Sequence, residues 1–269
     1  MSNVPSFWRE DERALAETFV RDGYAILPTE SREDLDRIRD LMADIAASYL
    51  KLPHPEDKGA FLDHIHEKVD IQRLNDLRLA VIREMNEEPW TRLSYFNTAR
   101  KALETLVGNE LAMQLRINLS IQLPNDDSSL LPVHADVWAG DSPYEVVLWI
   151  PYVHVYGTKT MYILPRDKDS QYQAKMNELK LKSAEELYRA IEPDLRWLDI
   201  PYGNVLLFTQ NVMHGNIVNR EPETRWSSNC RFKSVFSPYR DKKLGEFFEP
   251  ILVRPATRIG ASYRLPSVT

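Results

Sequence analysis

The chain has 269 residues, of which 43% are hydrophobic and 28% are charged, and its net charge is −6. These values are typical of a water-soluble globular protein with room for one substantial core, and the lack of a basic excess argues against nucleic acid as the main partner. No apolar run approaches the roughly 18 residues of a membrane-spanning helix, so we expect no membrane partner. The N-terminus lacks the apolar stretch of a signal peptide, and the single cysteine, Cys230, excludes an intrachain disulfide. We therefore expect a reducing, cytoplasmic location.

The first part of the chain, about residues 1–110, has the pattern of a helical region. Gly23 is a residue type that ends helices, and Ser31 and Asp34 have the spacing of an N-terminal capping box. A short strand is expected just after Gly23. Apolar residues at helical period predict helices at about 9–23, 31–50, 74–87 and 91–107.

From about residue 111 to about 240 the pattern changes to short strands. Residues 113–124 alternate polar and apolar side chains, which is typical of a strand with one wet and one dry face. Further strands are predicted at 145–153, 158–165, 195–201, 204–210, 215–219 and 225–238.

A charged helical insertion at about 168–191 interrupts these strands, and we expect it to act as a lid or as a dimerisation element. A helical front followed by short strands predicts a single domain over 1–269 that is mainly β with helices. Its core would be a double-stranded β-helix, or jelly roll, with an N-terminal helical layer packed on one face and a tail at 241–269.

His134 and Asp136 stand two residues apart, just before a run rich in β-branched and aromatic residues. Side chains two residues apart in an extended segment project to the same side, so an imidazole and a carboxylate could bind one ion. His214, at the end of an apolar strand, supplies a third ligand. Two histidines and one carboxylate form the facial triad of non-haem iron(II) oxygenases. We predict that these three residues hold a catalytic metal; the alternatives are a polar turn and a histidine bonded to the backbone.

Arg225 follows His214 by 11 residues and alternates with Ser227, Asn229 and Arg231 onto one face of a predicted strand. A guanidinium can bind a carboxylate through two parallel hydrogen bonds, and a buried arginine without an anion lowers the stability of the fold. We predict that Arg225, helped by Ser227, binds the distal carboxylate of 2-oxoglutarate. Arg231 is the rival anchor; it could instead contact substrate or close an internal ion pair.

The order histidine, aspartate, histidine and arginine resembles that of the iron(II)/2-oxoglutarate-dependent dioxygenase superfamily, and "RWS" resembles its Arg-x-Ser co-substrate motif. "FVRDGYAILP" resembles the N-terminal signature of the phytanoyl-CoA-dioxygenase-like branch. More narrowly, "HADVWAGDSPYEVVLWIPYV", "MYILP", "TRWSSNCRFKSVFSPY" and "FFEPILVRPATRIGASY" resemble oxygenases of carbohydrate and aminoglycoside biosynthesis clusters, with the orthosomycin oxygenases among the relatives.

The resemblance implies a double-stranded β-helix with iron(II) at one mouth. It also implies that O2 and 2-oxoglutarate are consumed, with release of succinate and carbon dioxide, while an unactivated C–H bond of the substrate is oxidised. The substrate would be a saccharide or aminoglycoside-like small molecule in a biosynthetic pathway, oxidised by hydroxylation or by ring closure such as orthoester formation. Halogenases of the family lack the carboxylate ligand, so Asp136 argues against halogenation.

Three alternatives to this function stay open at the level of sequence. One is a hydroxylase of a non-sugar metabolite, such as an amino acid or a lipid. The others are a cupin-like metalloenzyme that does not use 2-oxoglutarate and a non-catalytic jelly-roll binding module. A homodimer is the default expectation for the assembly.

Other polar and aromatic residues are candidates for weaker roles. Further contacts to the co-substrate are predicted for Asn118, Gln122 and Thr160. Substrate contacts are predicted for Arg116, Trp138, Asp141, Tyr144 and Arg231, because aromatic rings pack on the C–H faces of sugars while polar groups bind hydroxyls. Core packing, a turn at "GDSP" and plain solvent exposure are the alternatives. The alternation at 113–124 does not decide which of its faces points into the barrel.

The remaining histidines and the cysteine are expected to play no part in catalysis. His64 and His66 form another His-x-His pair, but they lie between a loop and a helix and are expected to be solvated or at the rim of the site. His154 is expected to be structural and His54 to lie on a surface loop. Cys230 is expected to be buried and inert.

Overall fold

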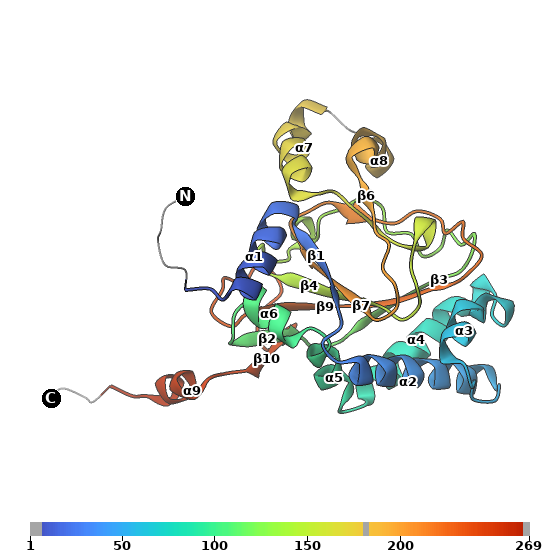
Figure 1. Ribbon diagram of the computed structural model, residues 1–269, viewed down its shortest axis with the longest axis horizontal. Helices are drawn as coiled ribbons and strands as arrows, with labels where there is room; N and C mark the ends of the chain where they lie inside the picture. Colours follow the sequence, from blue (N-terminus) through green and yellow to red (C-terminus); the bar gives the residue numbers. More distant parts are fainter. Residues whose placement is uncertain (1–6, 180–182, 266–269) are drawn as a thin grey trace.

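The computed structural model describes residues 7–179 and 183–265. Within them the chain forms two antiparallel sheets, and a group of helices lies along one side of the larger sheet (Figure 1). This arrangement confirms the prediction of a double-stranded β-helix core with an N-terminal helical layer. The boundaries assigned to the parts of the single domain stay a prediction.

The larger sheet has seven strands in the order β1-β7-β4-β9-β2-β10, with β3 also paired to β9. Their bounds are β1 Tyr24–Pro28, β2 Leu111–Gln114, β3 Asn118–Gln122, β4 Val146–Pro151, β7 Asn204–Thr209, β9 Arg225–Ser234 and β10 Phe248–Leu252. The smaller sheet has the order β6-β5-β8, with bounds β5 Tyr162–Ile163, β6 Arg196–Trp197 and β8 His214–Gly215. The long strand β9 pairs with β4, β2 and β3 and therefore forms the centre of the larger sheet.

The N-terminal helices begin and end where local signals place them. Gly23 ends α1 in a left-handed conformation with φ of 82°, and the Ser31 hydroxyl accepts a hydrogen bond from the Asp34 amide at the start of α2. The helices of this region are α1 Glu10–Asp22, α2 Arg32–Leu50, α3 Lys58–Asp63, α4 Ile71–Glu87, α5 Thr91–Asn97 and α6 Arg100–Leu106. The later helices are α7 Arg166–Leu179 and α8 Ala184–Ile191, which lie in the insertion, and α9 Pro255–Ser262.

Several predicted elements differ from those observed. The strand expected at 113–124 is two strands, because the Asn86 side chain bonds both the amide and the carbonyl of Ile117 and replaces the ladder there. The helix expected at 91–107 is also split, into α5 and α6. The strand expected at 215–219 is reduced to His214–Gly215, and the tail at 241–269 contains β10 and α9.

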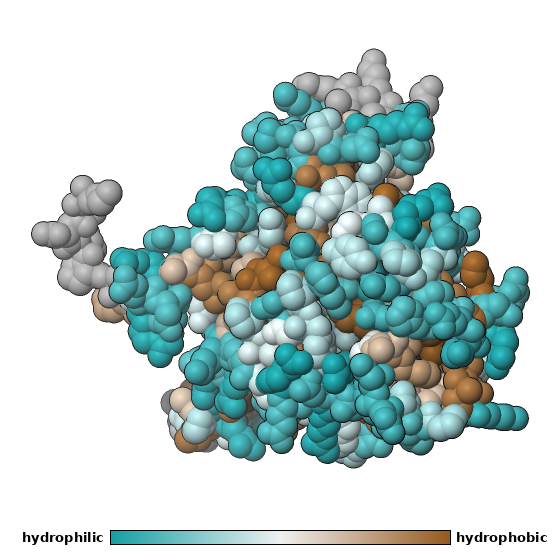
Figure 2. All heavy atoms as spheres, turned by 45° about the vertical axis from the view of Figure 1, so that its right-hand side comes forward, coloured by the Kyte–Doolittle hydropathy of each residue, from teal (hydrophilic) through white to brown (hydrophobic). Residues whose placement is uncertain are grey.

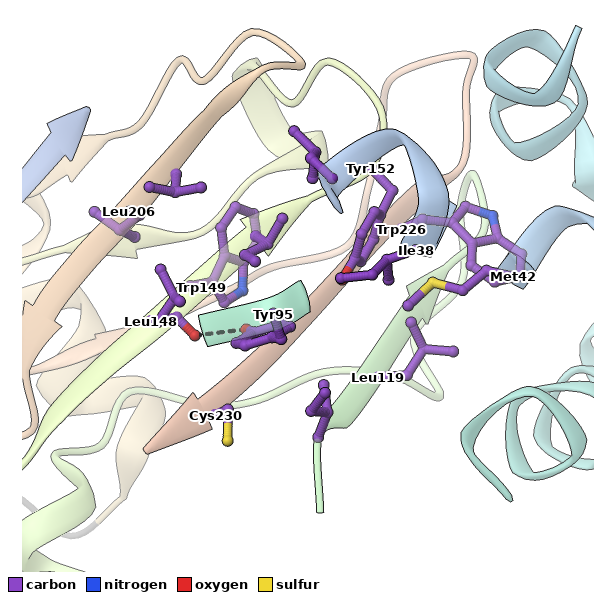
Figure 3. Close-up of a cluster of buried hydrophobic side chains, with 14 of the residues drawn as sticks. Ile38, Met42, Tyr95, Leu119, Leu148, Trp149, Tyr152, Leu206, Trp226 and Cys230 are labelled. Atoms are coloured by element: carbon purple, nitrogen blue, oxygen red, sulfur yellow. Dashed lines mark hydrogen bonds between the residues drawn. The ribbon is translucent and has the colours of Figure 1, made fainter. Parts of the chain in front are cut away.

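A continuous hydrophobic core joins the helical layer to the larger sheet (Figure 3). Ile38 and Met42 of α2 are fully buried, as is Trp226 of β9, and each such side chain contributes roughly 1.5–3 kcal/mol through burial. The Tyr95 hydroxyl of α5 donates to the Leu148 carbonyl of β4 at 2.8 Å, the dashed line in Figure 3. The core thus fixes the position of β4 and β9 relative to the helices.

Cys230 lies in the same core, as expected, and burial raises the pKa of its thiol to about 12. Polar side chains dominate the face of the molecule in Figure 2, with apolar side chains gathered in patches between them. Among the described residues, no helix combines the length and the apolar composition needed to cross a membrane.

Candidate active site

His134 and His214 come from distant parts of the chain and lie against each other. The amide of each donates to the carbonyl of the other, at 3.0 and 2.9 Å, and their ring centroids are 4.4 Å apart. The Nδ1 atom of His134 is 2.7 Å from the Pro132 carbonyl, and that of His214 is 3.0 Å from the Val212 carbonyl. With Nδ1 protonated and donating, Nε2 of each ring keeps its lone pair for a metal ion.

Asp136 completes the set. It is the first residue of a 3-10 helix, Asp136–Ala139, and its Oδ1 atom lies 3.5 Å from His134 Nε2. The potential ligand atoms of His134, Asp136 and His214 all lie within 4.8 Å of one another, so small side-chain movements would bring them onto one ion. Two imidazoles and one carboxylate are a donor set that suits iron(II) and leaves the other coordination positions open.

The surroundings of Asp136 and His214 favour the protonation states that a metal ion requires, whereas those of His134 favour its protonated form. Burial acts to raise the pKa of Asp136, but the nearby side chains of His134, His214 and Arg231 favour its ionised form and hold the pKa well below its ordinary value. Burial lowers the pKa of His214 to about 4. Burial also opposes protonation of His134, but the interactions with the Asp136 carboxylate and the Pro132 carbonyl together outweigh it and raise the pKa of His134. At neutral pH the carboxylate is therefore ionised and His214 is neutral, as metal binding demands.

The three side chains line one cavity with a volume of about 290 Å³. Its apolar lining consists of Leu131, Val147, Trp149, Met161 and Phe208. Its polar lining includes Asn118, Ser120, Asn216, Ser227 and Asn229. Arg225 and Arg231 also reach it, so the predicted co-substrate anchor and its rival both share a cavity with the metal ligands.

Arg225 is a buried cation in the wall of this cavity, only 3% exposed. Its Nη1 donates to the Thr160 carbonyl at 3.2 Å and its Nη2 to the Ser120 hydroxyl at 3.1 Å. Burial lowers the pKa of Arg225 to about 10, and no carboxylate of the described chain offsets this effect of burial. Arg225 Nε, Ser227 Oγ and Thr160 Oγ1 are buried without a hydrogen-bond partner in the described chain. A buried cation with unsatisfied polar atoms nearby fits an incoming carboxylate, so these residues fit 2-oxoglutarate.

Arg231 differs from Arg225 because it already has carboxylate partners. Its Nη2 lies 3.2 Å from Asp136 Oδ2, and its Nε lies 3.3 Å from Asp141 Oδ1. Of the roles predicted for Arg231, the internal ion pair is the one present in this structure. The same contacts make Arg231 a poorer co-substrate anchor than Arg225, since its charge is already compensated. Its contact with a substrate stays a prediction.

The other predicted co-substrate residues lie in different environments. Asn118 lines the cavity and donates to the Asn229 side chain at 3.1 Å. Gln122 is fully buried, donates to the Ile217 carbonyl at 2.8 Å and lies outside the cavity lining. Thr160 contacts Arg225 through its carbonyl. Direct contacts of these side chains with 2-oxoglutarate therefore stay predictions.

The predicted substrate contacts are mostly away from the cavity. Trp138 is 47% exposed and Tyr144 is 57% exposed, while Arg116 is also exposed, and none of them is among the lining residues. Asp141 is buried, accepts a hydrogen bond from Lys242 at 2.5 Å and forms an ion pair with Arg231. The segment after Asp136 turns into a 3-10 helix, which directs its aromatic side chains differently from the extended approach that the sequence suggested.

Several residues that the sequence did not single out take part in the site. Ser120 binds Arg225 and pairs across the sheet with Ser227. Its place on the polar face of the predicted strand was the available signal. Trp149 and Phe208 line the cavity. Their strands are buried on both faces almost throughout, so the period-two pattern that marks one face is missing.

The remaining histidines lie outside this cavity. His64 and His66 form a second group with Glu67, in which the potential ligand atoms also lie within 4.8 Å of one another. Their side chains are partly or fully exposed. His154 and His54 each pair with a neighbouring aspartate at the surface.

Solved structures share this fold, although no protein-family model matches the sequence and no curated protein matches it significantly. The non-haem monooxygenase ThoJ in its nickel complex is 14% identical, over 90% of this chain and 85% of its own, with a TM-score of 0.58. EctD from S. alaskensis, with 2-oxoglutarate and 5-hydroxyectoine, is 18% identical over 88% and 82%, with a TM-score of 0.56. HygX from Streptomyces hygroscopicus, with nickel and 2-oxoglutarate bound, is 10% identical over 88% and 90%, with a TM-score of 0.51. The chain thus has the fold of the non-haem, 2-oxoglutarate-dependent oxygenases.

Proposed function

We propose that this protein is an iron(II)- and 2-oxoglutarate-dependent oxygenase. The observation that carries the proposal is a single cavity that combines the His134–Asp136–His214 set with Arg225, a buried arginine that has no counter-charge in the described chain. Either feature alone has an ordinary structural explanation. Together they fit a metal ion and a dicarboxylate that spans from the ion to the guanidinium.

Different residues of the chain bind the metal ion and the co-substrate at this centre. Iron(II) and 2-oxoglutarate, when bound, supply the oxidising chemistry, in which O2 is consumed and the keto acid becomes succinate and carbon dioxide. The His-Asp-His set holds the ion from one side, and Arg225 binds the distal carboxylate with Ser227 beside it. Binding at both ends fixes the orientation of the co-substrate. The apolar cavity wall excludes water from the reacting groups.

We propose that the substrate is a polar small molecule of saccharide or aminoglycoside type, oxidised at a C–H bond in a biosynthetic pathway. Support comes from the cavity lining, where the Asn118–Asn229 amide pair can bond hydroxyls and the Trp149 ring can pack on a C–H face. Both hydroxylation and oxidative ring closure are compatible with this site. A hydroxylase of a non-sugar metabolite is the second candidate, because EctD shares the fold and its solved structure contains 5-hydroxyectoine.

The first test is anaerobic visible spectroscopy of the metal-free protein, with iron(II) added first and 2-oxoglutarate second. We expect a charge-transfer band that requires both additions, because it arises when the keto acid chelates the ion. Asp136→Ala and Arg225→Met should weaken the band, whereas Arg258→Met, which removes an exposed arginine of α9, should leave it unchanged. Wild-type protein that binds iron without forming the band would favour a cupin-like enzyme, and protein that binds neither would favour a binding module.

A second measurement addresses the substrate class. Release of succinate is measured with matched panels of saccharides, aminoglycosides and amino acids, each against the slow uncoupled turnover without substrate. We expect stimulation by members of the first two panels, because the polar lining suits hydroxyl groups. Stimulation by amino acids alone would replace the saccharide assignment with the non-sugar candidate while leaving the oxygenase proposal intact.

A further inference from the structure

We propose that Arg231 is a positioning residue for the metal centre: it holds Oδ2 of Asp136, so that Asp136 binds the ion through Oδ1 alone. The inference rests on the metal centre proposed above and adds a residue outside the ligand set. The two carboxylate oxygens already face different partners. Oδ1 lies 3.5 Å from His134 Nε2, on the metal side, and Oδ2 lies 3.2 Å from Arg231 Nη2.

Arg231 is itself held from several sides, which a positioning role requires. Its Nε is 3.2 Å from the Gln210 side-chain oxygen, and its Nη1 is 3.3 Å from the Gln114 side-chain oxygen. Asp141 lies 3.3 Å from Nε and is anchored in turn by Lys242. These partners come from β2, the residue that follows β7 and the loop that precedes β4. These contacts hold the guanidinium in place. The Arg231 side chain is also only 13% exposed.

Asp136 needs such a support more than the two histidines do. The histidines are fixed by their mutual backbone hydrogen bonds and by the carbonyls at each Nδ1. Asp136 lies instead in a short 3-10 helix, where the amide of Val137 makes only a long, 3.4 Å contact with the Gln210 carbonyl. The last torsion of an aspartate is broad, so an external contact must select the orientation of its carboxylate.

The orientation matters because it sets how many coordination positions stay open. A carboxylate that chelates through both oxygens occupies one more position than a carboxylate that binds through one. With Oδ2 held by Arg231, the three protein ligands leave three positions of an octahedral ion free, two for the keto acid and one for O2. Arg231 thus keeps the centre open without touching the co-substrate.

The test uses cobalt(II) as a spectroscopic probe in protein that contains no 2-oxoglutarate. When the second oxygen of a chelating carboxylate replaces a bound water, the ligand geometry around cobalt(II) is distorted and its visible bands change in position and intensity. Arg231→Met should therefore alter the visible spectrum per bound ion and weaken cobalt(II) binding about tenfold or more, the usual effect of losing a partner of a metal ligand. Arg231→Lys should restore part of both properties, since it keeps one charged donor. Arg258→Met, which removes an exposed arginine of α9, is the control and should behave like the wild type.

Each outcome decides between this role and another. An unchanged cobalt(II) spectrum and affinity in Arg231→Met would overturn the proposal. Tighter cobalt(II) binding with an unchanged spectrum would overturn it as well, because it would mean that Arg231 acts only as a charge that repels the ion. If circular dichroism shows that Arg231→Met is unfolded, Arg231→Lys decides, with a partial loss supporting the proposal and wild-type behaviour overturning it. Wild-type protein that binds no cobalt(II) would overturn the metal centre itself, a failure distinct from that of Arg231.

Discussion

Replacing Arg225 with methionine should leave the metal-free protein at least as stable as the wild type. Burial lowers the pKa of Arg225 from 12.5 to about 10, and at about 1.4 kcal/mol per pKa unit this corresponds to an unfavourable contribution of about 3 kcal/mol. The variant loses two hydrogen bonds, to the Thr160 carbonyl and the Ser120 hydroxyl, which contribute about 1 kcal/mol each. The balance is a gain of about 1 kcal/mol in the free energy of unfolding.

Urea unfolding of the metal-free protein, followed by tryptophan fluorescence, measures this balance. A second series keeps nickel(II) present throughout and adds 2-oxoglutarate, which at a hundred times its Kd should stabilise the wild type by about 2.7 kcal/mol and leave Arg225→Met almost unaffected. Arg258→Met should respond to 2-oxoglutarate like the wild type. A loss of 2 kcal/mol or more in metal-free Arg225→Met would refute the reasoning, because it would mean that the guanidinium has an internal counter-charge. Full stabilisation of the variant by 2-oxoglutarate would place the anchor elsewhere.

Three further changes test other parts of the structure. Burial raises the pKa of Asp169 to about 6, so the folded protein binds more protons than the unfolded chain between about pH 4 and pH 6. The wild type therefore loses stability as the pH rises through this interval. In urea titrations, the unfolding free energy of Asp169→Asn should rise relative to that of the wild type by up to about 3 kcal/mol across the same interval. A Cβ on Gly215 would lie 2.5 Å from the Tyr162 hydroxyl, so Gly215→Ala should lower the unfolding free energy by about 1–3 kcal/mol. It should also weaken nickel(II) binding in calorimetry, because His214 is the neighbouring residue. Wild-type affinity would mean that His214 tolerates the local backbone movement. Tyr95→Phe should lower the unfolding free energy by about 1–3 kcal/mol, since the Leu148 carbonyl loses its donor; an unchanged denaturation midpoint would contradict this.

Features that depend on a few neighbouring residues could be predicted from the sequence. The helix end at Gly23 and the N-cap at Ser31 are local, and both are confirmed. The grouping of His134, Asp136 and His214 was also predictable, because a pair at i and i+2 before one strand and a histidine at the end of another suit a jelly roll. Their role as metal ligands stays a prediction.

Features that depend on contacts between distant segments could not be predicted. The ion pair of Arg231 with Asp136 joins β9 to a 3-10 helix, and nothing in either segment signals the other. Trp138 was predicted to contact the substrate. The turn at Asp136–Ala139 leaves its side chain half exposed and outside the cavity lining, so this contact stays a prediction. The split of the strand at 113–124 depends on the side chain of Asn86, a residue of α4.

The backbone hydrogen bonds between His134 and His214 have a consequence for how the protein acquires its metal. The two residues are 80 positions apart in the chain, and bringing them together costs loop-closure entropy that only the finished barrel offsets. The unfolded chain therefore has no preformed chelate and would hold an ion weakly. Metal loading should follow folding, so the rate of uptake by a refolding protein would report when the two sheets close.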